Sequence, residues 1–194
     1  MAAISLVCGL GNPGAQYEAT RHNAGFWFLD ALSRSRPLPW RPETRFFGDL
    51  ADTRMGQQRV RFLKPATFMN ESGRAVGEAL RFYKLGTEAL TVFHDELDLA
   101  PFKIKVKQGG GHAGHNGLRS IDQHCGPEFR RVRIGIGHPG HKDRVTGHVL
   151  GDYAKAERDD LIAMLGAMGA EAEWLAKGDD VRFMNDVALR MQEI

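Results

Sequence analysis

The chain has 194 residues, of which 42% are hydrophobic and 26% are charged. This length and composition are typical of a soluble globular protein whose core needs neither metals nor disulfides, and we expect a single domain over residues 1–194. The formal net charge is only +2. Overall charge therefore does not indicate a nucleic-acid binder, and any contact with RNA would depend on local clusters of Lys and Arg.

The sequence predicts neither membrane insertion nor secretion. No apolar stretch approaches the length of a membrane span. The opening residues, MAAISLVCGLGNPG, lack a basic region and reach glycine and proline too early for a signal peptide. Cys8 lies in an apolar run, where we expect a buried free thiol. Such a thiol agrees with the reducing cytoplasm.

In the first half of the chain, strand and helix patterns alternate. In chain order they predict a strand over 4–10, a turn over 11–14, a helix over 23–35, a proline-rich loop over 36–43, strands over 46–53 and 58–63, and a helix over 70–84. Pro65 is expected to break the second strand of that pair. Gly86 is expected to close the last helix.

The second half predicts a strand over 90–94, a strand over 102–107, a glycine-rich loop over 109–117 followed by a short helix, a strand over 131–137, and helices over 155–177 and 180–192. Lys103, Lys105 and Lys107 alternate with apolar residues, so a strand would place the three lysines on one side. Strands and helices interleave throughout. The predicted fold class is α/β, a single domain with a central mixed, twisted β-sheet flanked by helices.

A glycine pattern after the first strand suggests a dinucleotide site, but its context argues against one. Gly9, Gly11 and Gly14 spell G-x-G-x-x-G. A dinucleotide site needs a helix that begins at this turn. Here Pro13 stiffens the turn, and the helical pattern begins only near Asn23. We therefore expect no nucleotide cofactor.

Metal and covalent chemistry are also disfavoured. The pairs His112/His115 and His138/His141 are spaced for zinc, but no H-E-x-x-H motif or cysteine pair accompanies them. No G-x-S-x-G motif is present, and Cys8 inside a strand is a poor nucleophile. We expect no metal.

Polar residues gather in four segments at predicted strand ends and helix starts, namely 11–23, 68–70, 94–96 and 114–117. In α/β sheets such positions lie at one edge, where ligands bind. Among them, one His, one Asp and three Asn (His22, Asp95, Asn12, Asn70 and Asn116) form a set that can hold a general base, orient it and offer neutral donors to an ester oxygen. Taken singly, Asn70 and Asn116 also fit helix N-caps, and Asn12 fits a turn residue.

Six strings in these and neighbouring segments resemble bacterial peptidyl-tRNA hydrolase. They are GLGNPG, TRHNAG, KPATFMNESG, HDELDL, GGGHAGHNGL and RIGIGHPG, in the family's order and spacing from residue 9 to 140. The resemblance implies a soluble, cytoplasmic, monomeric enzyme without cofactor that hydrolyses the ester between a peptide and tRNA. The alternative is a catalytically silent RNA-binding relative of the same fold, against which the intact His, Asp and Asn residues argue.

The resemblance also implies roles for single residues. His22 matches the catalytic base, and Asp95 matches the carboxylate that holds this base in its basic form. Asn12 matches a residue that helps to distinguish peptidyl-tRNA from aminoacyl-tRNA. The positions that match contacts to the tRNA 3′ end or the peptide are Tyr17, Phe68, Asn70 and Asn116.

The basic strand acquires a use from the same resemblance. Lys103, Lys105 and Lys107, with Arg133 nearby, are expected to meet phosphates of the tRNA acceptor stem, which position a substrate without reading its sequence. The sequence departs from the family pattern at Glu71, where an apolar residue is usual, and at Ala113, where glycine is common.

Overall fold

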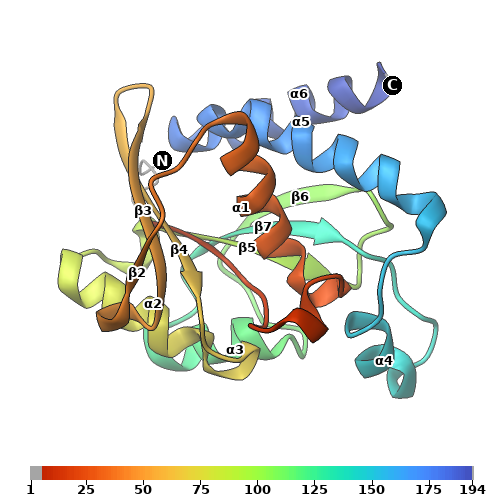
Figure 1. Ribbon diagram of the computed structural model, residues 1–194, viewed down its shortest axis with the longest axis horizontal. Helices are drawn as coiled ribbons and strands as arrows, with labels where there is room; N and C mark the ends of the chain where they lie inside the picture. The colour runs from red at the N-terminus through yellow and green to blue at the C-terminus, as the bar shows by residue number, and fades with distance from the viewer. Residues whose placement is uncertain (1–5, 194) are drawn as a thin grey trace.

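The computed structural model describes residues 6–193 and has one seven-stranded sheet at its centre (Figure 1). The strands are β1 (Leu6–Gly9), β2 (Arg41–Glu43), β3 (Gly48–Met55), β4 (Gln58–Pro65), β5 (Leu90–Glu96), β6 (Ile104–Gln108) and β7 (Arg130–Gly135). Their order is β2-β3-β4-β1-β5-β7-β6. The four central strands are parallel, whereas β2, β3 and β6 join antiparallel. The sheet is mixed, as predicted.

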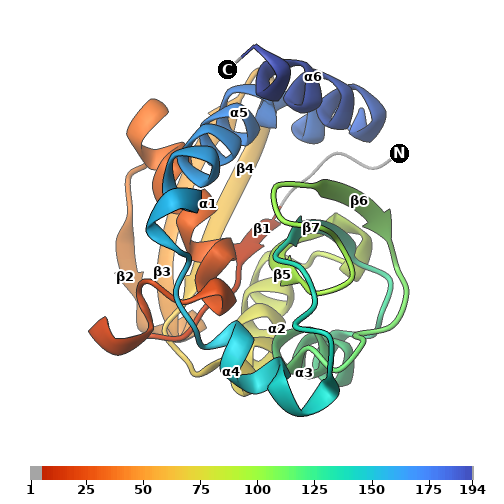
Figure 2. The same ribbon diagram turned by 90° about the vertical axis from the view of Figure 1, so that its right-hand side faces the viewer.

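Helices cover both faces of this sheet. They are α1 (Ala24–Ser35), α2 (Ser72–Tyr83), α3 (Asn116–Cys125), α4 (Val145–Val149), α5 (Arg158–Ala176) and α6 (Asp180–Gln192). In Figures 1 and 2, α1, α5 and α6 lie on one side of the sheet and α2 and α3 on the other, while the short α4 stands apart beside the strand ends. None of the helices in residues 6–193 is both long and apolar enough to cross a membrane.

Strand β1 divides the apolar core into two parts. Val7 points into the cluster beneath α1 and α5, whereas Leu6 and Cys8 point into the cluster beneath α2 and α3. Successive side chains of a strand face opposite ways, so a continuous apolar run suits a strand that is covered on both faces. Cys8 is a buried free thiol, as expected, and burial raises its pKa.

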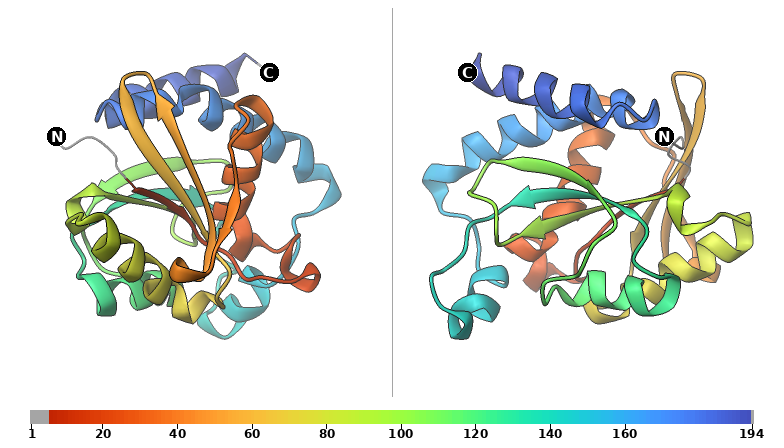
Figure 3. Two further views of the ribbon diagram at one scale, coloured as in Figure 1. Left: turned by 60° about the vertical axis from the view of Figure 1, so that its left-hand side comes forward. Right: turned by 180° about the vertical axis from the view of Figure 1, so that it is seen from behind.

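Two glycines allow the helices to approach the sheet edge and each other. A Cβ on Gly25 would lie 2.4 Å from both the Leu10 nitrogen and the Phe93 oxygen, so only glycine lets the start of α1 rest on β1 and β5. A Cβ on Gly73 would lie 2.1 Å from the Ser120 oxygen, where α2 meets α3. As a result, the segments that lead into α1, α2 and α3 all lie near the carboxyl ends of the parallel strands (Figure 3).

The element boundaries differ from the predictions at several places. The first strand is described only from Leu6, since residues 4 and 5 lie outside the described part. The predicted loop over 36–43 contains β2, and Pro65 is the last residue of β4 rather than a break. The helix predicted to run to Lys84 and close at Gly86 ends at Tyr83, because the next residue, Lys84, adopts a left-handed backbone (φ 56°). Strand β6 starts at Ile104, because Phe102 before it is also left-handed (φ 66°).

Candidate functional site

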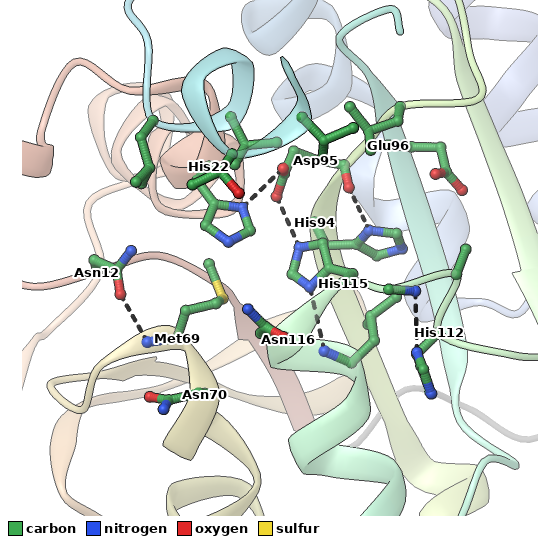
Figure 4. Close-up of a pocket in the computed structure, with 18 of the residues that line it drawn as sticks. Asn12, His22, Met69, Asn70, His94, Asp95, Glu96, His112, His115 and Asn116 are labelled. Carbon is green, nitrogen blue, oxygen red and sulfur yellow. Dashed lines mark hydrogen bonds and ion pairs between the residues drawn. The ribbon is translucent and has the colours of Figure 1, made fainter. Parts of the chain in front are cut away.

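One carboxylate lies between two histidines at the end of β5. The Nδ1 atom of His22 is 2.9 Å from Oδ2 of Asp95, and the Nε2 atom of His115 is 2.8 Å from Oδ1 of the same residue (Figure 4). His22 belongs to a 3-10 turn before α1, and His115 immediately precedes α3. Both oxygens of the Asp95 carboxylate are therefore occupied by ring nitrogens from opposite layers of the fold.

The hydrogen bonds of His115 fix its tautomer. Its Nδ1 atom accepts from the backbone N–H groups of Gly117 (3.1 Å) and Leu118 (3.3 Å), which caps α3. An accepting Nδ1 carries no proton, so the proton lies on Nε2 and is donated to Asp95. The tautomer of His22 is fixed by Asp95. An ionised carboxylate can only accept a hydrogen bond, so Nδ1 of His22 carries the proton and donates it. Its Nε2 atom is left without a proton and available as a base.

Electrostatics at the carboxylate favour this arrangement. Burial alone would raise the pKa of Asp95, but the two histidines and their hydrogen bonds hold it well below its usual range. Burial alone would lower the pKa of His22. The charge of Asp95 and the hydrogen bond to it outweigh burial, so the pKa of His22 lies above its usual value. The neighbouring His94 is fully buried, and burial followed by repulsion from His115 lowers its pKa to about 4.

An asparagine pair fixes the first polar loop beside His22. The side-chain oxygen of Asn23 accepts from the Asn12 backbone N–H at 2.8 Å, and its amide nitrogen donates to the Asn12 carbonyl at 3.0 Å. The side-chain oxygen of Asn12 then accepts from the Met69 backbone N–H at 2.7 Å. Since that oxygen is engaged with Met69, the amide NH₂ of Asn12 is the end left to donate to a substrate.

His22, Asp95, His115 and Asn12 line one cleft of about 520 Å³ at the carboxyl edge of the sheet. Of the residues proposed from the sequence, those in its lining are Asn12, Tyr17, His22, Phe68, Asn70, Asp95 and Asn116. Tyr17 and Phe68 meet edge to face at a ring separation of 6.3 Å, and Phe68 is 55% exposed. Residues of α4, Val145 and Val149 among them, form another part of the wall.

The basic-face lysines, Lys103, Lys105 and Lys107, are exposed and lie outside this lining. Lys105 pairs in register with Arg133 of β7, so these two side chains share a face of the sheet. Arg133 donates from Nε to Glu96 at 2.7 Å, and Glu96 lines the cleft. The basic face is thus joined to the cleft through an ion pair between neighbouring strands.

Two further polar residues, His115 and Asn23, belong to the site although their roles were not expected. From the sequence alone, His115 lies in the polar segment 114–117 and forms half of a possible zinc pair, and no catalytic role is assigned to it. Its position directly before a helix was the available signal of a cap, a role that the sequence assigned more readily to Asn116. The structure gives the cap of α3 to His115, and no side chain among residues 6–193 caps α2.

The three groups His22, Asp95 and His115 place potential ligand atoms within 4.8 Å of one another. In this arrangement, however, both nitrogens of His115 are engaged, one with two backbone N–H groups and the other with Asp95. Metal ligation by His115 would require breaking one of these sets. The hydrogen bonds therefore favour proton transfer over metal binding.

Comparisons with known proteins identify the family of this chain. The sequence profile of the family described as peptidyl-tRNA hydrolase matches residues 6–193. A peptidyl-tRNA hydrolase of Novosphingobium aromaticivorans is 66% identical over 192 residues, covering 97% of this chain and 98% of the relative. One of Erythrobacter litoralis is 65% identical over 189 residues, covering 97% of this chain and all of the relative (100%).

Solved structures give the same result. The peptidyl-tRNA hydrolase of Acinetobacter baumannii superposes with a TM-score of 0.89 at 44% identity, covering 95% of this chain and 94% of that one. Its Arg119Gln mutant superposes with a TM-score of 0.91 at 43% identity, covering 96% and 95%. On its sequence and its fold, this chain belongs to the peptidyl-tRNA hydrolase family.

Proposed function

We propose that this chain hydrolyses the ester bond between a peptide and tRNA, with His22 as the general base and Asp95 as the group that orients it. The observation that carries the proposal is the 2.9 Å contact between His22 Nδ1 and Asp95 Oδ2 in the cleft. This contact leaves Nε2 of His22 free to take a proton from water.

The reaction then balances in two steps. Nε2 takes a proton from water as the oxygen attacks the ester carbonyl, and Asp95 stabilises the imidazolium that forms. The bond to the tRNA oxygen breaks, and the proton on Nε2 passes to that oxygen. The products are a tRNA with a free 3′-terminal hydroxyl and a peptide with a new carboxyl group, which releases its proton to the solvent. Neutral amide donors from Asn12, Asn70 and Asn116 are suited to the carbonyl oxygen and the peptide backbone.

The remaining residues of the proposal concern the RNA. The rim aromatics Tyr17 and Phe68 offer rings on which an unpaired base of the 3′ end can stack. The basic-face lysines and Arg133 are suited to phosphates of the acceptor stem, a kind of contact that accepts any tRNA sequence. All of these groups come from one chain. We accordingly propose that the protein acts as a monomer in the cytoplasm, where translation produces its substrate.

Deacylation of an N-acetylated aminoacyl-tRNA tests the proposal. We expect turnover by the wild type and by a control, His141→Ala, because His141 is an exposed histidine outside the cleft. His22→Ala should fold normally, as judged by its melting temperature, and should not turn over. Equal rates for His22→Ala and the wild type would remove His22 from the mechanism. If all three proteins bound tRNA without hydrolysis, the chain would be an RNA-binding relative instead.

A further inference from the structure

A buried arginine that no proposed step of the reaction uses lies beneath the glycine-rich loop. Arg131 of β7 is 2% exposed, and its guanidinium group lies 4.1 Å from the centroid of the Phe129 ring. One terminal nitrogen donates to the carbonyl of Gly111 at 2.7 Å. The other donates to the carbonyls of Gly110 at 2.7 Å and Pro127 at 3.1 Å. Two of these three bonds hold the loop itself.

This arginine is the buried member of the basic face. It pairs in register with Lys107, as Arg133 does with Lys105. Lys107 is exposed, whereas both terminal nitrogens of Arg131 already donate to backbone carbonyls. Arg131 is therefore a poor phosphate ligand, and its fixed, planar set of donors suits a structural task at the loop.

The loop over residues 109–115 needs such an external contact. Gly109, Gly110 and Gly114 have positive φ angles, and so does Ala113 at 48°. A non-glycine residue in the left-handed region carries a steric cost that the surroundings must offset. Ala113 is also the position at which the family commonly has glycine. Around Gly111 and Gly114 the described residues leave open space, because an added Cβ would meet none of their atoms within 4 Å.

The loop leads directly to the second histidine of the site. The backbone N–H of His115 donates to the His112 carbonyl at 2.8 Å, which closes the turn after the two carbonyls held by Arg131. His115 in turn donates to Asp95 (Figure 4). Arg131 is therefore connected to the carboxylate that orients His22 by its hydrogen bonds to the loop, by the short stretch of backbone from Gly111 to His115, and by the hydrogen bond from His115 to Asp95.

We infer that Arg131 is a positioning residue for hydrolysis, which holds the glycine-rich loop so that His115 keeps its hydrogen bond to Asp95. The inference rests on the proposed function of His22 and Asp95. When His115 withdraws, Asp95 loses one donor and its remaining charge acts on His22 alone. The pKa of His22 then rises further, and less of the base is unprotonated at neutral pH.

The experiment compares Arg131→Met and Arg131→Lys with Arg130→Met. Arg130 is the matched control, because it is equally buried on the same strand but donates to Leu175 and Asp180 on the opposite face. We expect kcat to fall about 10- to 100-fold in Arg131→Met, with the KM for tRNA nearly unchanged and the acid limb of the kcat profile shifted to higher pH. Arg131→Lys should lie between Arg131→Met and the wild type, since a lysine cannot reach all three carbonyls. The control should lower the melting temperature without moving the acid limb.

Two readouts test the connection to His115. The imidazole N–H proton that His115 shares with Asp95 should give a downfield NMR resonance, absent in His115→Ala, weakened in Arg131→Met and kept in the control. In a His115→Ala background, Arg131→Met should cause no further loss of kcat, since both changes act on one contact. Three results would each overturn the inference. They are additive losses of kcat in the double variant, an unchanged resonance in both Arg131 variants, and an acid limb that shifts as far in Arg130→Met as in Arg131→Met. Activity retained in His22→Ala would instead refute the proposed function. The two failures can be told apart, because the resonance of the His115 proton can be measured without turnover.

Discussion

Replacing Asp95 with Asn exchanges one carboxylate oxygen for an NH₂ group between two histidines. Because Nδ1 of His115 accepts from two backbone N–H groups, its proton must stay on Nε2. The oxygen of the new amide will therefore turn to His115, and the NH₂ group will face His22. His22 must then accept at Nδ1 and carry its proton on Nε2. The base loses the lone pair that attacks the water proton.

The size of the fall in kcat follows from the cost of the other amide orientation, in which the NH₂ group faces His115. Turning the NH₂ group toward His115 would set two buried donors against each other, at a cost of about 1–3 kcal/mol. The unproductive orientation should therefore dominate by about 10- to 100-fold. The loss of the negative charge that stabilises the imidazolium adds to this, and a fall in kcat of about 10³- to 10⁴-fold is expected, as in other His–Asp pairs.

The assay is deacylation of N-acetylated aminoacyl-tRNA under single-turnover conditions, with tRNA affinity measured separately and expected to change little. Asp95→Ala should retain more activity than Asp95→Asn, since an alanine imposes no tautomer on His22. Adding His115→Ala to Asp95→Asn should restore about tenfold or more of the lost rate, because the amide can then turn its oxygen to His22. A double variant that is slower than Asp95→Asn alone would refute this reasoning, and so would a large loss of tRNA affinity in Asp95→Asn.

The other predictions concern pH, packing, salt and metal. The acid limb of kcat/KM should have its midpoint above the ordinary histidine pKa of about 6.5. The pKa of His22 is raised, and only the neutral ring can act as a base, so activity should be lost at a higher pH than for an ordinary histidine. A midpoint at or below the ordinary value would contradict this prediction. Asn23→Ala should lower the free energy of unfolding by about 1–3 kcal/mol, since two hydrogen bonds to Asn12 are lost, and urea denaturation of the variant beside the wild type measures it. Neutralising the basic-face lysines should weaken tRNA binding and flatten its dependence on salt concentration, and an unchanged slope would reject a phosphate role. A chelator such as EDTA should leave turnover unaltered, whereas inhibition reversed by zinc would revive the histidine pairs as metal ligands.

Much of the fold follows from local pattern, and the exceptions have physical causes. The apolar runs at β1 and β5 and the spacing in α1 and α6 carry a strong signal, and these elements lie where they are predicted apart from a few end residues. Strand β2 was missed because its residues, Arg-Pro-Glu, are neither apolar nor β-prone. It pairs only with β3 at the edge of the sheet, where proline is tolerated. Helix α4 was missed because five residues with a glycine among them form no periodic pattern.

The site divides in the same way. That His22, Asp95 and the asparagines would meet at one edge could be inferred, since strand ends of a parallel sheet gather there. The contact between His115 and Asp95 could not, because it depends on how a glycine-rich loop with four left-handed residues returns to β5. Such a path is set by tertiary contacts, among them the bonds from Arg131, and leaves no period in the sequence.

The division of the core by β1 has a consequence for how activity depends on folding. His22 arrives from the layer that holds α1, while Asn70, His115 and Asn116 arrive from the layer that holds α2 and α3. Neither half of the molecule contains a working set of groups without the other. Hydrolysis should therefore disappear together with the first layer to detach from the sheet, which makes turnover a sensitive reporter of partial unfolding along the whole chain.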